Sequence, residues 1–245
     1  VPAYTTMRQC ASGMTALHNG AMSIWSGVND LVLAGGTESM SGAVHYIRHA
    51  RYGVGTGNVE LVDALTEGQF QSQPQETYGR YNMGATAENV AETYGITREE
   101  QDEFSYSSQC KAIAAIDAGR FKDEIVPVVI KGKKGDIVFD TDEFPRRDTS
   151  LEKMAKLKPV FNITHDEKGR LFNTSERTGT VTAASSSGRN DGASVLMIAS
   201  SEKAAELGVK PMAKIIGIGT AACDPKYMGM GPIYAVPKAL KMAGI

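Results

Sequence analysis

A strand–helix–strand pattern fills the first 40 residues and restricts the chain to an α/β architecture. Residues 1–8 are rich in Val, Tyr and Thr, which favours a strand. Apolar side chains then recur at spacings of three and four from Met14 to Val28, which predicts a helix over 11–26. The apolar run within 30–34 is typical of a parallel strand that is covered on both faces.

A long mixed insertion over 41–190 separates this unit from a second apolar run at 194–198. Helices are predicted over 86–94, where Thr86 caps the start, and over 97–118, where Thr97 and Glu100 form a capping box. The stretch 162–177 is polar and irregular, and strands are predicted at 125–130, 179–182 and 212–218. A helix over 201–207 returns the chain to α/β order.

Composition excludes several classes of protein. A net charge of −2 gives no overall basic field to favour nucleic acid, and no apolar run approaches the roughly 20 residues that span a bilayer. Three widely spaced cysteines argue against a disulfide framework or a paired-cysteine zinc site. They favour a reducing compartment, so we expect a cytoplasmic protein. The chain opens in a predicted strand and stops just after a predicted helix, so we expect both ends to continue in a longer protein.

Cys10 is the candidate nucleophile because it stands where the first predicted strand turns into the helix. A thiol at a helix N-terminus faces backbone N–H groups and the positive end of the helix dipole, and both favour the thiolate. The small residues that follow, Ala11, Ser12 and Gly13, leave room for a ligand. The alternative is a buried structural cysteine, which is common for a lone Cys.

Several motifs together resemble the thiolase family of acyl-CoA C-acyltransferases, which includes acetyl-CoA acetyltransferases and 3-ketoacyl-CoA thiolases. They run in order through essentially all 245 residues. The matching stretches are RQCASG at 8–13, AGGTESMS at 34–41, MGATAENVA at 83–91, AGRFKDEI at 118–125, LKPVF at 157–161, GTVTA at 179–183, NDGA at 190–193 and MGP at 230–232.

The resemblance implies a layered αβαβα fold of two similar α/β halves, each with a mixed five-stranded sheet. In this chain, residues 1–40 and 191–210 would belong to the N-terminal core, and 211–245 would begin the C-terminal half. Residues 41–190 would form a large inserted α+β loop domain for coenzyme A binding and oligomerisation. The family further implies a homodimer or homotetramer.

The activity implied by the resemblance is ping-pong acyl transfer, which makes or cleaves 3-ketoacyl-CoA such as acetoacetyl-CoA. Cys10 would attack the thioester of an acyl-CoA and carry the acyl group. Its backbone N–H would donate to the oxyanion. Coenzyme A esters would be substrates, and the family implies no metal and no prosthetic group.

Three further catalytic motifs of the family do not occur in this sequence. They are an Asn-Glu-Ala loop, a Gly-His-Pro loop that supplies the activating His, and a Cys-x-Gly loop that supplies a second catalytic Cys. Cys110 and Cys223 lie in other contexts. His18 would lie about 12 Å along the helix from Cys10, which is beyond hydrogen-bond reach. We therefore expect these 245 residues alone to be catalytically incomplete.

Three positions match coenzyme A contacts of the family. Ser187 matches a Ser that contacts the pantetheine, Arg146 an Arg that packs on the adenine, and Met83 an apolar wall near the thioester. Each has an ordinary alternative: a turn Ser, a solvated Arg and a core Met. Asn82 stands where many biosynthetic members carry His, which leaves the preferred acyl group open.

Two other functions stay open at this point. A ketosynthase of the same superfamily would take acyl groups from a carrier protein, but such enzymes usually carry a Ser-rich string after the Cys. A thiolase-like protein that has lost catalysis would only bind lipid or coenzyme A.

Overall fold

The computed structural model describes residues 1–176 and 179–245. The chain divides into two compact units. Unit 1 comprises 1–68, 189–224 and 230–245, and unit 2 comprises 69–188 and 225–229. The four-part division expected from the sequence stays a prediction.

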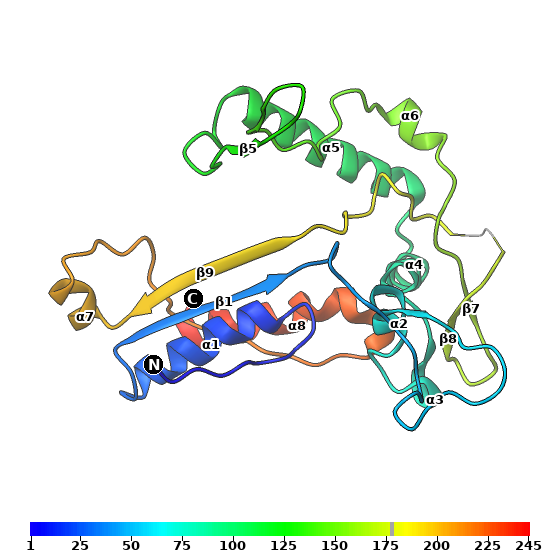
Figure 1. Ribbon diagram of the computed structural model, residues 1–245, viewed down its shortest axis with the longest axis horizontal. Coiled ribbons are helices and arrows are strands. Elements are labelled where there is room, and N and C mark those ends of the chain that lie inside the picture. Colours follow the sequence, from blue (N-terminus) through cyan, green and yellow to red (C-terminus); the bar gives the residue numbers. More distant parts are fainter. Residues whose placement is uncertain (177–178) are drawn as a thin grey trace. The chain divides into compact units, whose positions relative to one another are not determined.

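Unit 1 is built on helix α1 and a two-stranded ribbon. It contains α1 (Ser12–Trp25), β1 (Leu31–Glu38), β2 (His45–Tyr46), β3 (Val62–Asp63), β9 (Gly192–Ala199), α7 (Ser201–Glu206) and α8 (Gly231–Ala243). Strand β1 pairs with β9 along its whole length, from Leu31 opposite Ala199 to Glu38 opposite Gly192. Helix α1 runs along these strands, and its own start lies toward the end of β1 (Figure 1).

A glycine allows α1 to lie close to this ribbon. Gly20 and Ala21 form the buried part of the helix. A Cβ on Gly20 would come within 2.9 Å of Ile198 Cδ1 and 3.2 Å of Val32 Cγ1. The helix predicted over 11–26 is therefore confirmed, and its alanine and glycine face is what packs on the two strands.

Three expectations about strands are wrong. Residues 1–7 form no strand, and those at 212–218 run as extended chain beside α8 instead of pairing. Strand β1 is antiparallel to β9 and not parallel, and both strands keep apolar side chains exposed, such as Leu33 and Met197. The apolar run therefore predicted neither the direction of the neighbouring strand nor the exposure of these side chains in the described residues.

Unit 2 is a helical and short-stranded body. It contains α3 (Gln75–Tyr78), β4 (Gly79–Arg80), α4 (Met83–Tyr94), α5 (Arg98–Asp117), β5 (Val128–Ile130), β6 (Ile137–Phe139), α6 (Leu151–Ala155), β7 (Ile163–His165) and β8 (Leu171–Asn173). Helix α2 (Ala64–Phe70) spans the boundary between the units, as does the 3₁₀ helix η1 (Pro225–Met230). The core of unit 2 is formed by Tyr81, Ala85 and Leu171, with Tyr78 and Ile163 packed against them.

Local capping signals decide where the two long helices of unit 2 begin. The capping box of α5 is confirmed, since Glu100 N donates to Thr97 Oγ1 at 3.2 Å and Thr97 N donates to Glu100 Oε2 at 2.8 Å. Helix α4 begins three residues earlier than predicted, because the cap is Asn82 and not Thr86. The Asn82 side chain accepts from Ala85 N, and the Thr86 hydroxyl donates to Met83 O within the helix.

The segment predicted to be irregular over 162–177 contains a small sheet instead. Strand β8 lies between β4, which is parallel to it, and β7, which is antiparallel. The carboxylate of Asp166 shapes the β7–β8 turn by accepting from Arg170 N at 3.0 Å and from Arg170 Nε at 2.7 Å. Arg177, the last residue of that segment, lies outside the described residues. Residues 179–182 form no strand, although Val160 N donates to Val181 O at 2.9 Å.

Candidate active site

Cys10 lies in a tight turn two residues before the first residue of α1, and it is exposed. Gln9, the residue before it, has a φ of 50°, a left-handed conformation that is unusual for a side chain other than Gly. The Ser12 hydroxyl holds this turn from both sides. It accepts from Arg8 N at 2.7 Å and donates to Gln9 O at 2.7 Å.

The turn that carries Cys10 lies at the carboxyl end of β1. A Cβ added to Gly36 near the end of β1 would find Gly13 Cα, in the first turn of α1, at 3.9 Å. Small residues on both elements therefore allow the strand to pass close to the start of the helix.

Asp191 directly precedes β9 and lies at the same end of the β1–β9 ribbon. Its carboxylate accepts from Ser41 N at 2.8 Å and from the Ser41 hydroxyl at 2.5 Å. These hydrogen bonds from the Ser41 side chain and then its backbone hold the pKa of Asp191 below its ordinary value. The segments that follow β1 and precede β9 are thereby joined beside the candidate nucleophile.

No histidine among the described residues hydrogen-bonds Cys10. His18 lies further along α1, and burial together with the positive charge of Arg8 lowers its pKa. His165 lies in unit 2, where its Nε2 pairs with Asn89 Oδ1 at 2.9 Å. The described part of the chain therefore provides no base for the thiol.

The three predicted coenzyme A contacts all lie in unit 2, whereas Cys10 lies in unit 1. Met83 is the half-buried first residue of α4, and its N–H donates to Gln69 Oε1 at 3.4 Å. Ser187 is exposed at the end of the loop that leads toward β9.

Arg146 is held by its backbone, while its side chain is exposed. Its N–H donates to Gln109 Oε1 on α5 at 2.8 Å. The neighbouring Arg147 pairs with Asp117 at 2.7 Å, and this pairing lowers the pKa of Asp117. Arg146 makes no such ion pair in the described part of the chain, which leaves its guanidinium available to a ligand.

Helix α4 and the loop of Ser187 are joined by the carboxylate of Glu88. The backbone N–H groups of Thr180 and Val181 and the Thr180 hydroxyl all donate to it. Gln101, near the start of α5, adds a hydrogen bond from its Nε2 to Thr180 Oγ1 at 2.8 Å. Arg146 is held at Gln109, about 12 Å further along α5 by helical rise.

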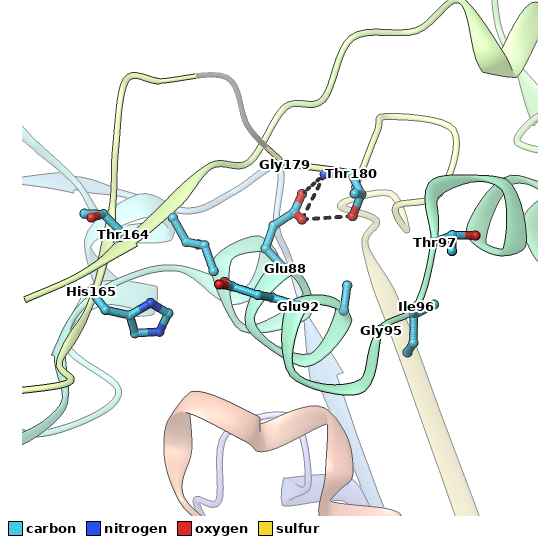
Figure 2. A pocket seen from close by; sticks show the side chains of 11 residues that line it. Glu88, Glu92, Gly95, Ile96, Thr97, Thr164, His165, Gly179 and Thr180 are labelled. Atoms are coloured by element: carbon cyan, nitrogen blue, oxygen red, sulfur yellow. Dashed lines mark hydrogen bonds between the residues drawn. The ribbon is translucent and has the colours of Figure 1, made fainter.

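A cavity of about 610 Å³ lies in unit 2 beside this group of hydrogen bonds. Its wall includes Glu88 and Glu92 of α4, Gly95 to Thr97, the three residues of β7, and Gly179 with Thr180. Figure 2 shows Glu88 pointing toward Gly179 and Thr180. None of the four predicted site residues lines this cavity, so it provides no evidence for their roles.

Sequence reasoning missed two residues that organise the candidate site, Ser12 and Glu88. Ser12 follows a candidate nucleophile by two positions, which fits a side chain that bonds the backbone of a turn. Glu88 and Asn89 are buried polar residues inside α4, and each stands next to small or apolar residues. A charged residue that is buried needs hydrogen-bond donors or an opposite charge beside it, but the sequence does not identify the residues that provide them.

The described residues contain neither a candidate metal site nor a membrane-spanning helix. No group of three or more His, Cys, Asp or Glu side chains is placed to hold a metal ion there. None of the helices that the structure describes is long and apolar enough to cross a bilayer.

Comparison with known proteins gives consistent matches over the whole chain. The family model described as "Thiolase, N-terminal domain" matches residues 1–202. An acetyl-CoA acetyltransferase of Syntrophomonas wolfei is 47% identical over 247 residues, covering 100% of this chain and 58% of that protein. Beta-ketothiolase BktB of Cupriavidus necator is 42% identical, covering 100% of this chain and 57% of that protein.

A solved structure gives the same result. The crystal structure of the Bacillus anthracis acetyl-CoA acetyltransferase matches with a TM-score of 0.83 and 41% identity, covering 98% of this chain and 56% of that chain. The 245 residues thus have the fold of the N-terminal half of such proteins and span somewhat over half the length of the relatives they match.

Proposed function

We propose that this chain, which belongs to the thiolase family, supplies the acyl-carrying cysteine of an acyl-CoA C-acyltransferase. The observation that carries the proposal is the position of Cys10. It is exposed, lies next to a left-handed residue, and sits where the start of α1 meets the carboxyl end of β1. A sealed apolar pocket, the setting of a structural cysteine, would have argued against it.

The reaction proceeds in two acyl transfers. The Cys10 thiolate attacks the carbonyl carbon of an acyl-CoA, a new S–C bond forms, and the bond to the coenzyme A sulfur breaks. Coenzyme A leaves and takes up a proton. A second acyl-CoA loses an α-proton, which balances the proton taken up by coenzyme A, and the carbon of the resulting enolate attacks the acyl-cysteine carbonyl. A C–C bond forms, the C–S bond to Cys10 breaks, and 3-ketoacyl-CoA leaves with the thiolate restored. The reverse sequence cleaves 3-ketoacyl-CoA with coenzyme A.

Three residues of unit 2 are proposed to bind coenzyme A. Ser187 is exposed at the end of its loop and is free to contact the pantetheine. The exposed Arg146 guanidinium can stack on the adenine, since its planar face suits an aromatic ring. Met83 would supply an apolar wall near the thioester. The substrates are coenzyme A esters, and the mechanism uses no prosthetic group.

We also propose the finer architecture and the setting that the family implies. The exposed apolar residues of β1 and β9, such as Leu33 and Val195, suit a ribbon that belongs to a larger five-stranded mixed sheet in an αβαβα fold. The three cysteines are free, which is consistent with a reducing, cytoplasmic location. A homodimer or homotetramer is expected.

Trapping the acyl-enzyme tests the proposal. The native protein is incubated with acetyl-CoA and digested. The mass of the peptide that contains Cys10 is then measured by mass spectrometry. We expect an added acetyl group on Cys10 in the wild type and in a Cys223→Ser control, and none in Cys10→Ser. Acetylation that persists in Cys10→Ser, or its absence from the wild type, would refute the assignment.

A further inference from the structure

Glu88 is a buried carboxylate, and among the described residues its hydrogen bonds go to one short stretch of chain. The residue is 4% exposed, in the middle of α4. Val181 N donates to Oε1 at 2.6 Å, and Thr180 N is shared between Oε1 at 2.8 Å and Oε2 at 2.9 Å. The Thr180 hydroxyl donates to Oε2 at 2.9 Å. Burial of a carboxylate is costly without such donors, so its placement depends on this backbone.

Two glycines leave the space that this arrangement needs. A Cβ on Gly179 would lie 2.4 Å from Glu88 Oε1 and 2.0 Å from Phe161 O. A Cβ on Gly84 would lie 2.2 Å from the Phe161 ring. Gly179 therefore lies close to both the Phe161 backbone and Glu88. Figure 2 shows Glu88 of α4 hydrogen-bonded to the stretch that begins at this glycine.

The fixed stretch leads directly into the turn that ends at Ser187. Thr182 is fully buried, and its N–H donates to Ser185 Oγ at 2.9 Å. The Ser186 hydroxyl donates to Thr182 O at 2.7 Å. These short-range bonds form a rigid turn, so the direction in which Ser187 leaves it follows from the position of Thr182 and hence from Glu88.

We propose that Glu88 is a positioning residue for coenzyme A binding, which acts through the backbone of residues 180–182 to hold Ser187 against the ligand. This inference rests on the proposed function, because Ser187 is assigned there as a coenzyme A contact. A carboxylate is required because it offers only acceptors to three converging donors. A glutamine of the same shape would set its own NH₂ group against one of these N–H groups.

The first test compares two substitutions on the same helix in the native protein. Glu88→Gln should weaken coenzyme A binding, measured by calorimetric titration, about tenfold. Glu92→Gln is the matched control. Glu92 is exposed, makes no hydrogen bond to 180–182, and lies one turn further along α4. It should bind coenzyme A like the wild type. Iodoacetamide should alkylate Cys10 at the wild-type rate in both variants, because that reagent does not use the coenzyme A site.

A double-mutant cycle with Ser187→Ala separates positioning from general damage. If Glu88 acts through Ser187, then Glu88→Gln should change the dissociation constant by less than about twofold in the Ser187→Ala background. Thr180→Val keeps the side-chain shape and removes the hydroxyl's hydrogen bond to Glu88, together with the one that the hydroxyl accepts from Gln101 Nε2. It should weaken binding by a few fold and couple to Ser187→Ala in the same way, which provides a result even where Glu88→Gln fails to fold.

The outcomes distinguish this inference from the proposed function. A wild-type protein that neither binds coenzyme A nor becomes acetylated on Cys10 overturns both. A protein that is acetylated on Cys10, but in which the Glu88 or Thr180 effect is fully additive with that of Ser187, overturns the positioning role alone. Weakening by Glu92→Gln equal to that by Glu88→Gln also overturns it, since loss of charge on α4 would then explain the effect.

Discussion

Gln9 and Ser12 together determine how Cys10 is presented. A left-handed conformation at a residue with a side chain costs free energy and persists only where surrounding bonds enforce it. Here the enforcing group is the Ser12 hydroxyl, which bonds the backbone of Arg8 and of Gln9. The strain therefore lies directly next to the thiol, and it depends on a single side chain.

Ser12→Ala should slow the reaction of Cys10. Loss of both hydrogen bonds allows the turn to relax, so we expect alkylation by iodoacetamide to be about three- to tenfold slower. Cys110, which is also exposed, serves as the internal reference within the same sample. Ser12→Thr retains the hydroxyl and should react like the wild type. An unchanged rate in Ser12→Ala would show that the turn does not need this clamp.

The sequence singles out Cys10 as a candidate nucleophile but gives no sign of the contacts of Glu88, and the reason is physical. The signals around Cys10 are local, because the predicted helix start and the small residues lie within a few positions of it. Glu88 accepts hydrogen bonds from Thr180 and Val181, which lie 92 and 93 positions later in the sequence. No periodicity in the chain reports a contact at that separation, so only the folded structure reveals the partner.

At the scale of elements, helices were more predictable than strands. The capping box placed α5 correctly because helix signals act over three or four residues. Strand β1 was found, but its antiparallel pairing with β9 was not, since strand direction is fixed by a partner more than 150 positions away. The short β7 and β8 were missed because their turn depends on the Asp166 carboxylate and not on an apolar alternation.

Two glycine substitutions in helices should have opposite effects on stability. Gly84→Ala in α4 places a methyl group 2.2 Å from the Phe161 ring, so we expect destabilisation of about 1–3 kcal/mol. Gly13→Ala in α1 has nothing within 4 Å and gains helix propensity, so we expect stabilisation of about 0.5–1 kcal/mol. Urea denaturation measures both. Effects of the same sign would contradict the packing described for α4.

The hydrogen bonds that join the segment after β1 to the segment before β9 should make stability depend on pH. Hydrogen bonds from Ser41 lower the pKa of Asp191 below its ordinary value of 3.8. A carboxyl with a lowered folded-state pKa stabilises the fold above its unfolded-state pKa, and this stabilisation is lost as pH falls through the folded-state pKa. The melting temperature should therefore be flat between about pH 7 and 5 and fall below about pH 4.

Asp191→Asn is the control for this pH dependence. It removes the titrating group, so the variant should be less stable at neutral pH and should lose less stability on acidification. Asp166 carries a similarly lowered pKa from Arg170 and remains in the variant, so part of the acid dependence should persist. If the melting temperature of the variant falls with pH as steeply as that of the wild type, Asp191 is excluded as a source of the pH dependence.

At the scale of the whole molecule, an exposed apolar hairpin is the surface that we predict to carry the proposed self-association. Strands β5 and β6 pair antiparallel, and all six of their residues are exposed and apolar: Val128, Val129, Ile130, Ile137, Val138 and Phe139. An isolated two-stranded hairpin is marginally stable in water, and apolar patches of this kind mark association surfaces. A second copy of the chain is the partner that the proposed homo-oligomer provides.

We predict that a charged pair on this hairpin lowers the oligomeric state. Val129 lies directly opposite Val138, so Val129→Lys combined with Val138→Glu keeps the hairpin paired while it replaces the apolar pair on one of its two faces by a charged pair. Light scattering on the native protein should give the mass of at least two chains for the wild type and a smaller mass for the variant. Lys134→Ala, in the charged turn of the same hairpin, should leave the mass unchanged. A wild type that is monomeric would contradict the prediction.

The exposure of Cys10, which under the proposed function would admit a thioester, also admits peroxide. A thiolate without a covering layer is the form that oxidises first to sulfenic acid and then, irreversibly, to sulfinic acid. Protein handled in air without a reductant would therefore lose its acyl acceptor while keeping its fold. An oxidised preparation would keep the circular dichroism spectrum of the folded protein, and only a titration of its thiols would show that Cys10 is no longer reduced.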